Sequence, residues 1–459
     1  MSRLDVETQL VSATVEPTEP QVAERLLGEK TSRRLTSIDA LRGIAALAVV
    51  FNHLPRDHGG QLDSTFFALL PLDFGTLGVP LFLVISGFCI HLAVARRALA
   101  GDKASVDWAA FWKRRFYRLY PPYVAAIALS VSAYFLVRTY GHVDPGERID
   151  SLWTDLVTHL LLIHNVLPAF DESLFNPAFW TLALEEQLYA LFAVVLLLRR
   201  RLPIFQVLWI SLGVTLIWRW GMLVAQFALA REAGIAREAQ VISIGSLPDI
   251  GSWHNWPFAF WFLWVLGAVA AEGYTRAIAL PAWCYSRRLA LALAAFAIPA
   301  FTKTLGRYTE FWLTDEGAQG WLRLALNMAV GVSPLAFGVI GFIVLNRWVR
   351  AEQRGEFGAR WATALTSIGV FSYSLYLVHI PTLALLEMWL PLGPRADFVA
   401  TIWRMLVYVP ICVGVAFLFF LAVERHFLKH RKGRRTAAVV APAPEAASIT
   451  LPAEPLSTR

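Results

Sequence analysis

Three ionisable side chains interrupt an apolar segment near the start of the chain. Asp39, Arg42 and His53 lie within residues 37–53, where most other residues are apolar. Helix geometry places Arg42 and His53 about 20° apart in azimuth and about 16 Å apart along the axis, with Asp39 within about 40° of His53. The three therefore share one stripe, on which Asp39 and Arg42 can pair at i,i+3. Ionisable groups inside a membrane helix are costly and indicate a functional site; a snorkelling arginine with a structural histidine is the alternative.

A second polar position lies in the apolar segment 179–198, which contains Trp180 and Glu185. We expect this segment to enter the membrane from the outer side, so Glu185 lies about 9 Å in from Phe179. His53 is expected at a similar depth. This carboxylate and imidazole can then meet in the outer half of the membrane, where Glu185 would fix the histidine tautomer. The alternative places Glu185 at the membrane interface, with Trp180 in an aromatic belt.

A basic and aromatic segment, residues 111–122, precedes the third apolar stretch and contains Arg114, Arg115 and Arg118. Arg115 and Arg118 are three residues apart, so on a helix they can grip one phosphate group together. An anionic cofactor phosphate at the cytoplasmic face would therefore suit this segment. Ordinary anchoring of a membrane helix by basic and aromatic residues explains the same composition and is the alternative.

The elements that must position these residues are membrane helices. Hydrophobic residues make up 57% of the 459 residues and charged residues 16%, whereas soluble domains have about 25% charged residues. Because a span needs about 20 mostly apolar residues, the sequence predicts an all-α polytopic transmembrane bundle of about ten spans. The predicted spans lie near 38–56, 75–95, 120–137, 179–198, 204–226, 256–272, 289–302, 321–345, 364–390 and 400–422.

Segment 155–170 is a further apolar stretch, but it is short and contains His159 and His164. If it does not span, the connections rich in Lys and Arg all lie on one side, which the positive-inside rule makes cytoplasmic. These connections are 96–118, 199–201, 276–288, 347–360 and 425–435. We therefore expect a re-entrant or interfacial helix at 155–170. We also expect the protein to lie in a bacterial-type inner membrane, with both termini on the cytoplasmic side.

The polar ends and the charge distribution exclude other classes. We expect residues 1–33 to be a disordered cytoplasmic N-terminus without a signal peptide, 34–430 the membrane domain, and 431–459 a disordered cytoplasmic tail. The net charge is +7, yet the basic residues lie in short clusters between apolar runs, so nucleic-acid binding is not expected. The three cysteines have no paired metal-ligand spacing, and no metal site is expected.

Five motifs in order resemble the acyltransferase-3 family of membrane acyltransferases, over about residues 34–425. They are Leu35-Thr-Ser-Ile-Asp-Ala-Leu-Arg42 continuing to His53, Gly78-Val-Pro-Leu-Phe-Leu-Val-Ile-Ser-Gly-Phe88, Arg115-Phe-Tyr-Arg118-Leu-Tyr-Pro121, Trp180-Thr-Leu-Ala-Leu-Glu-Glu-Gln-Leu-Tyr189 and Gly369-Val-Phe-Ser-Tyr-Ser-Leu-Tyr-Leu-Val-His379-Ile-Pro381. By this resemblance, His53 is the catalytic histidine and Arg42 its signature partner. Arg115 and Arg118 contact acyl-CoA, Glu185 is the polar residue of the fourth span, and His379 is a further candidate.

The resemblance implies a membrane O-acyltransferase that moves an acyl group, with acetyl expected, from acyl-CoA to a hydroxyl of a cell-envelope or exported glycan or a similar acceptor. Acetyl-CoA is then the donor substrate, no cofactor is tightly bound, and the partners are donor, acceptor and membrane lipid. His53 would act as a general base, contributing about 10² to 10⁴ in rate, or form an acyl-histidine; both remain open. The alternative class is a transporter of a lipid-linked glycan or small solute, whose pathway the same charges would line.

Overall fold

The computed structural model describes residues 34–54, 77–99, 106–141, 152–166, 174–232, 255–301, 319–358, 360–393 and 398–428. Every element in these ranges is a helix, which confirms the predicted all-α class. The expected terminal segments 1–33 and 431–459 lie outside the described residues. The main helices are α2 (Thr36–Asn52), α4 (Gly78–Leu99), α5 (Trp108–Tyr140), α6 (Leu152–Leu160), α7 (Trp180–Arg199), α8 (Ile204–Glu232), α9 (Trp261–Tyr274), α10 (Arg287–Phe301), α12 (Gln319–Gln353), α13 (Arg360–Val370), α14 (Ser372–Trp389), α15 (Phe398–Phe419) and α16 (Arg425–Leu428).

Among the described residues, fewer than the predicted ten helices are long and apolar enough to cross a membrane. Six helices among the described residues are long and apolar enough, and the bent pair α13–α14 makes a seventh if it counts as one span. Helices α2, α9 and α10 have only 17, 14 and 15 residues. The predicted span 364–390 is not straight, because α13 and α14 meet at 77°. The polytopic class therefore stands, whereas the count of ten is not confirmed.

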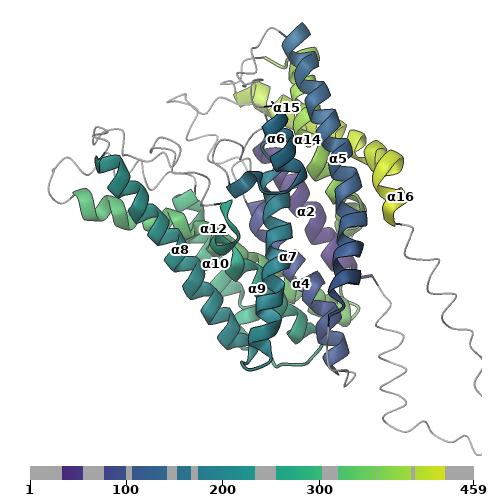
Figure 1. The fold of residues 1–459 in the computed structure, drawn as a ribbon. Helices are drawn as coiled ribbons and strands as arrows, with labels where there is room; N and C mark the ends of the chain where they lie inside the picture. Colours follow the sequence, from purple (N-terminus) through teal and green to yellow (C-terminus); the bar gives the residue numbers. More distant parts are fainter. Residues whose placement is uncertain are drawn as a thin grey trace, which may run out of the picture.

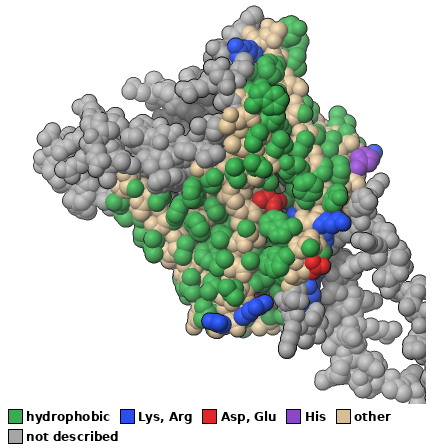
Figure 2. Space-filling model, viewed as in Figure 1, with side chains coloured by type: hydrophobic (Ala, Val, Ile, Leu, Met, Phe, Trp, Pro, Cys, Tyr) green, Lys and Arg blue, Asp and Glu red, His purple; other side chains and the backbone are tan. Residues whose placement is uncertain are grey.

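The helices differ strongly in how much of their surface is covered by protein. Within its most apolar window, α4 is 67% buried, whereas α8 and the α15–α16 region are each 22% buried. Figure 1 shows α4 inside the bundle, with α8 on one side and α15 and α16 on the other. Large apolar side chains cover the outer helices, and Figure 2 shows a broad hydrophobic face. Such a face is expected for a bundle surrounded by lipid.

Glycines allow two pairs of helices in the centre to touch through their backbones. A Cβ atom on Gly369 of α13 would lie 1.7 Å from the Asp39 carbonyl oxygen of α2, and one on Gly43 would lie 2.2 Å from the Leu365 carbonyl oxygen. The α4–α9 crossing is equally close, since a Cβ on Gly87 would lie 1.9 Å from the Trp264 carbonyl oxygen. Small residues at helix crossings are typical of membrane bundles. These contacts hold α2 and α4 in the middle of the molecule.

Helix α2 is also held at its first turn by a distant carboxylate. The two oxygens of Glu352, near the end of α12, accept hydrogen bonds from the backbone N–H groups of Thr36 and Ser37 at 2.8 and 2.9 Å. The first N–H groups of a helix have no partner within the helix, and a negative charge there is favourable. Glu352 therefore anchors the start of the helix that ends at His53.

The basic segment 111–122 and the predicted span at 120–137 belong to one continuous helix. Helix α5 has 33 residues and includes Pro121 and Pro122. Its first turn is capped by Asp107, whose side chain accepts from the Ala110 N–H at 2.9 Å. Because the helix is already formed at Arg115 and Arg118, both arginines project from a rigid element.

Segment 155–170 does not form a spanning helix within its described part. Helix α6 has nine residues, about 14 Å of helix, against a hydrocarbon core of about 30 Å. The chain then turns at Leu162, where φ is 55°, into the 3₁₀ turn η3 (His164–Val166). Residues 167–170 lie outside the described part. The geometry agrees with a segment that does not cross the membrane.

Protein covers the polar groups of this short segment. The rings of His159 and His164 are both buried and stack at 3.8 Å. Burial lowers the pKa of His159 to about 3 and that of His164 to about 4, so both are neutral at physiological pH. Asn165 and Gln187 of α7 are joined by a 2.7 Å hydrogen bond. The segment is thereby attached to the helix that contains Glu185.

Candidate active site

His53 and His379 form a pair, although 326 residues separate them in sequence. His53 caps the end of α2, and His379 is fully buried in α14. Nε2 of His379 lies 3.3 Å from Nδ1 of His53, and the ring centroids are 5.1 Å apart. Each Nδ1 also faces a carbonyl oxygen of its own helix, that of Val49 at 2.9 Å for His53 and that of Tyr376 at 2.7 Å for His379.

These contacts indicate which tautomer each ring adopts in its neutral form. A carbonyl oxygen only accepts, so Nδ1 carries the hydrogen in both rings. Nε2 of His379 then has a lone pair. The Nδ1–H of His53 is shared between two acceptors, this lone pair and the Val49 carbonyl oxygen. In neutral His53 the remaining lone pair is on Nε2. That atom is the one able to take a proton.

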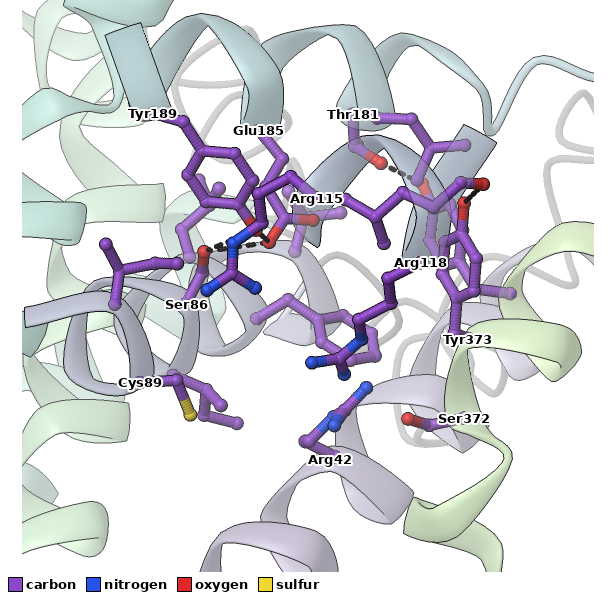
Figure 3. Close-up of a pocket in the computed structure, with 18 residues that line it drawn as sticks. Arg42, Ser86, Cys89, Arg115, Arg118, Thr181, Glu185, Tyr189, Ser372 and Tyr373 are labelled. Carbon is purple, nitrogen blue, oxygen red and sulfur yellow. Dashed lines mark hydrogen bonds between the residues drawn. The ribbon is translucent and has the colours of Figure 1, made fainter. Parts of the chain in front are cut away.

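Arg42, Arg115 and Arg118 line one cavity of about 140 Å³, although they come from two helices (Figure 3). Arg42 comes from α2, and the other two come from successive turns of α5. The remaining wall consists of residues from α4, α7 and α14: Val79, Phe82, Leu83, Ile85, Ser86, Cys89, Ile90, Thr181, Leu182, Glu185, Tyr189, Ser372, Tyr373 and Tyr376, with Leu119 of α5. A concave site with clustered guanidinium groups suits an anionic ligand.

The guanidinium group of Arg115 is held by aromatic rings. It lies 5.4 Å from the ring centroids of both Phe111 and Tyr189. Its Nε is buried and has no hydrogen-bond acceptor among the described residues. A buried N–H without a partner is costly, and Arg115 is one of the residues that line the cavity.

Arg114 and Trp180 are predicted site residues that do not line this cavity. Arg114 is exposed and does not line it. Trp180 is partly buried against Phe260, with ring centroids 5.9 Å apart. The turn of α5 that directs Arg115 and Arg118 inward necessarily directs Arg114 elsewhere, because neighbouring helical residues differ by about 100°. Of the three arginines predicted in this segment, Arg115 and Arg118 therefore line the cavity and Arg114 does not.

Asp39 is buried, and it forms its ion pair with Arg34, before the start of α2. The sequence had suggested a pair with Arg42 on the same helix. Arg42 instead reaches the cavity with Arg118 (Figure 3). Asp39 thus fastens the beginning of the helix, and Arg42 lines the cavity.

Glu185 lies in the cavity wall, and its hydrogen-bond partners differ from the expected one. Its carboxylate accepts from the Ser86 hydroxyl at 2.8 Å and from the Tyr189 hydroxyl (Figure 3). The contact that orients His53 is made by His379. The carboxylate and the imidazole pair therefore occupy separate parts of the structure.

A small apolar cluster borders the cavity and also contacts His379. Tyr376 and Phe82 line the cavity, and their rings meet edge to face with centroids 6.0 Å apart. Tyr376 and Val49 are buried in the same cluster, and His379 lies beyond, with its ring centroid 5.8 Å from that of Tyr376. Neither His53 nor His379 lines the cavity. The arginine end and the histidine pair are thus neighbouring sites with an apolar partition.

Three residues of this region were missed by the sequence reasoning. Ser86 and Tyr376 lie inside motifs that had been recognised, and their polar atoms within apolar helices were a usable signal. Glu424 is almost fully buried at the end of the π-helical turn η9 (Phe420–Glu424), where it accepts from the Ser374 N–H at 3.2 Å and from its hydroxyl at 2.5 Å. It thereby caps the start of α14, the helix that contains His379.

Known proteins resemble this chain over most of its length. The acyltransferase MdmB of Streptomyces mycarofaciens is 26% identical over 371 residues, which cover 76% of this chain and 88% of that protein. The O-acetyltransferase OatA of Staphylococcus aureus (strain NCTC 8325) is 25% identical over 384 residues, 80% of this chain and 53% of that protein, so the match spans about half of OatA. No solved structure matches. A family model described as an acyltransferase domain matches residues 35–421, and the chain is therefore a membrane acyltransferase of the acyltransferase-3 family.

Proposed function

We propose that this membrane O-acyltransferase takes an acetyl group from acetyl-CoA on the cytoplasmic side of the inner membrane. It transfers the group to a hydroxyl of a cell-envelope or exported glycan or a similar acceptor. The observation that carries the proposal is the arginine-lined cavity, which ends next to the His53–His379 pair. The name of OatA describes it as an O-acetyltransferase, which supports the choice of acetyl.

The cavity supplies the donor end of the mechanism. Arg42, Arg115 and Arg118 offer guanidinium groups to the phosphates of CoA, and Arg115 has a buried N–H still to be satisfied. Arg42 and His53 lie about 16 Å apart along α2. The long arm of CoA extends over this distance, so that its phosphates stay at the arginines while the thioester approaches the histidines. In this orientation, with the basic connections in the cytoplasm, both termini of the chain also lie in the cytoplasm.

His53 acts on the acceptor. Its Nε2 takes the proton of the attacking hydroxyl while the oxygen adds to the thioester carbonyl, and the CoA thiolate then leaves. A positioned base of this kind contributes about 10² to 10⁴ in rate. His379 holds His53 in the required tautomer, a role first expected of Glu185. An acyl-histidine formed on the same nitrogen is the other route.

The test uses the full chain in nanodiscs with acetyl-CoA labelled in the acetyl group. Adding a glycan fraction from the envelope of the producing cells should release free CoA thiol and move label into the glycan in equal amounts. A transporter would release no thiol. Loss of O-acetyl groups from envelope glycans of a deletion strain would then identify the acceptor. No thiol release with any envelope fraction, including lipid-linked glycans, would overturn the proposal.

A further inference from the structure

The partition between the cavity and the histidines is made of few side chains. Phe82 of α4 and Tyr376 of α14 form its centre. Val49, Ala178 and Tyr376 are buried in it, and Val79, Leu182 and Ile380 pack against it with Phe82. Four of these residues, Val79, Phe82, Leu182 and Tyr376, also line the cavity. Because Tyr376 borders the cavity and its ring also contacts His379, a group that leaves the cavity toward the histidine pair on this side meets the partition.

The two rings at its centre are held differently. The Tyr376 hydroxyl donates to the Ala178 carbonyl oxygen at 2.6 Å and is also hydrogen-bonded to Thr181. The backbone carbonyl oxygen of Tyr376 accepts a hydrogen bond from Nδ1 of His379. The Tyr376 ring is thus fixed at its hydroxyl end, and it lies against the His379 ring, with centroids 5.8 Å apart. Phe82 is partly buried and is held by packing alone, because its side chain has no polar atom. When an acyl group passes, the Phe82 ring is therefore the one that moves, and the Tyr376 ring stays in place.

Building on the function proposed above, we propose that Phe82, against the fixed ring of Tyr376, selects the donor by the length of its acyl group. Acetyl and other very short chains pass, whereas longer chains do not fit between the two rings. An apolar pocket distinguishes one methylene by about 10- to 200-fold, so a limit set by one phenyl ring is sufficient to select a chain length. The substrate class is then short-chain acyl-CoA.

The experiment measures equilibrium binding to the full chain in nanodiscs. Labelled acetyl-CoA is displaced by unlabelled CoA, acetyl-CoA, butyryl-CoA and hexanoyl-CoA, and each affinity is expressed relative to that of CoA for the same variant. Wild-type protein should bind hexanoyl-CoA at least about tenfold more weakly than acetyl-CoA. Phe82→Leu and Phe82→Ala should reduce this difference at least tenfold. Phe82→Trp should act in the opposite direction and weaken butyryl-CoA.

Phe88→Leu is the matched control, because Phe88 lies on the same helix, contacts Tyr274 and does not line the cavity. Its chain-length ratio should equal that of wild type. An unchanged ratio in the Phe82 variants, or an equal change in Phe88→Leu, would overturn the selectivity proposal while leaving acyl-CoA as donor. Absence of saturable acetyl-CoA binding to wild-type protein would instead overturn the proposed function itself. The three Phe82 variants change size in both directions, so one poorly folded variant does not decide the result.

Discussion

At the scale of single residues, the site consists of two groups with different tasks. The arginines face a cavity open to a charged ligand, and the histidines lie behind an apolar partition. In the proposed mechanism, the arginines bind the charged donor and the histidines move the proton. Substitutions in the two groups should have different kinetic signatures.

His53→Gln should abolish most acyl transfer in a folded protein. The glutamine amide still hydrogen-bonds to the Val49 carbonyl oxygen and His379, but it cannot accept a proton near neutral pH, so the rate should fall by about 10² to 10⁴. CoA release from acetyl-CoA measures this rate. His53→Ala should behave likewise, and Leu47→Ala on the same helix should retain activity. Near-normal turnover in His53→Gln would make His53 a structural residue.

The double change Arg115→Ala with Arg118→Ala should raise KM for acetyl-CoA by at least about tenfold, because each charged hydrogen bond is worth about 1.5–3 kcal/mol. The maximal rate at saturating donor should change little, since phosphate contacts are distant from the reacting carbonyl. Arg114→Ala is the control, because Arg114 is exposed and outside the cavity. If both variants have wild-type KM values, the basic segment serves only to anchor α5.

At the scale of helices, the site depends on close crossings that tolerate no side chain. The α2–α13 crossing brings the Asp39 carbonyl oxygen to the position that a Cβ on Gly369 would occupy. Directly after this crossing the chain bends by 77° into α14. The bend directs α14 so that His379 meets His53 at the opposite end of α2. The geometry of one crossing therefore influences the pairing of the two histidines.

Gly369→Ala should destabilise the protein and reduce activity together. Its Cβ would lie 1.7 Å from a backbone oxygen that cannot rotate away, and overpacking of this kind costs about 1–3 kcal/mol or more. The midpoint of thermal unfolding in detergent measures the effect. Gly414→Ala on α15 has no atom within 4 Å of its Cβ, and it should leave the midpoint unchanged or raise it, since alanine favours a helix by about 1 kcal/mol. Equal midpoints for both variants would contradict this account of the crossing.

At the scale of the whole molecule, the arrangement predicts how the protein lies in the membrane. The short helix α6 and the turn η3 do not cross it, so the ends of α7 and α12 that are rich in arginine face the same side. With that side cytoplasmic, the function proposed above requires the arginine cavity to be reached from the cytoplasm. The proposed acceptor would then reach the histidine pair from the outer side.

Reporter fusions test this orientation. Reporters placed after Arg200, Arg354 and Lys432 should give cytoplasmic signals, because basic connections stay inside. A reporter near Glu232 should give an external signal. Alkaline phosphatase and green fluorescent protein fusions, which are active on opposite sides, provide the measurement. An external signal at Arg200 would mean that segment 155–170 crosses the membrane.

The sequence by itself determined the properties that depend on local composition and periodicity. Long apolar runs predicted the helical membrane class, and helical spacing correctly brought Arg115 and Arg118 to one face of α5. The motif around Arg42 and His53 indicated the family that the whole-chain comparison shows. These inferences succeed because hydropathy and helical azimuth are set by residues close together in the chain.

Only the tertiary structure decided which polar groups meet. The partner of His53 is His379 rather than Glu185, the partner of Asp39 is Arg34 rather than Arg42, and α13–α14 is broken where one span was expected. Such pairings depend on the rotation, tilt and depth of helices far apart in sequence. Those quantities are set by backbone contacts at glycines and by side-chain packing across the bundle, and no pattern within a single helix contains them.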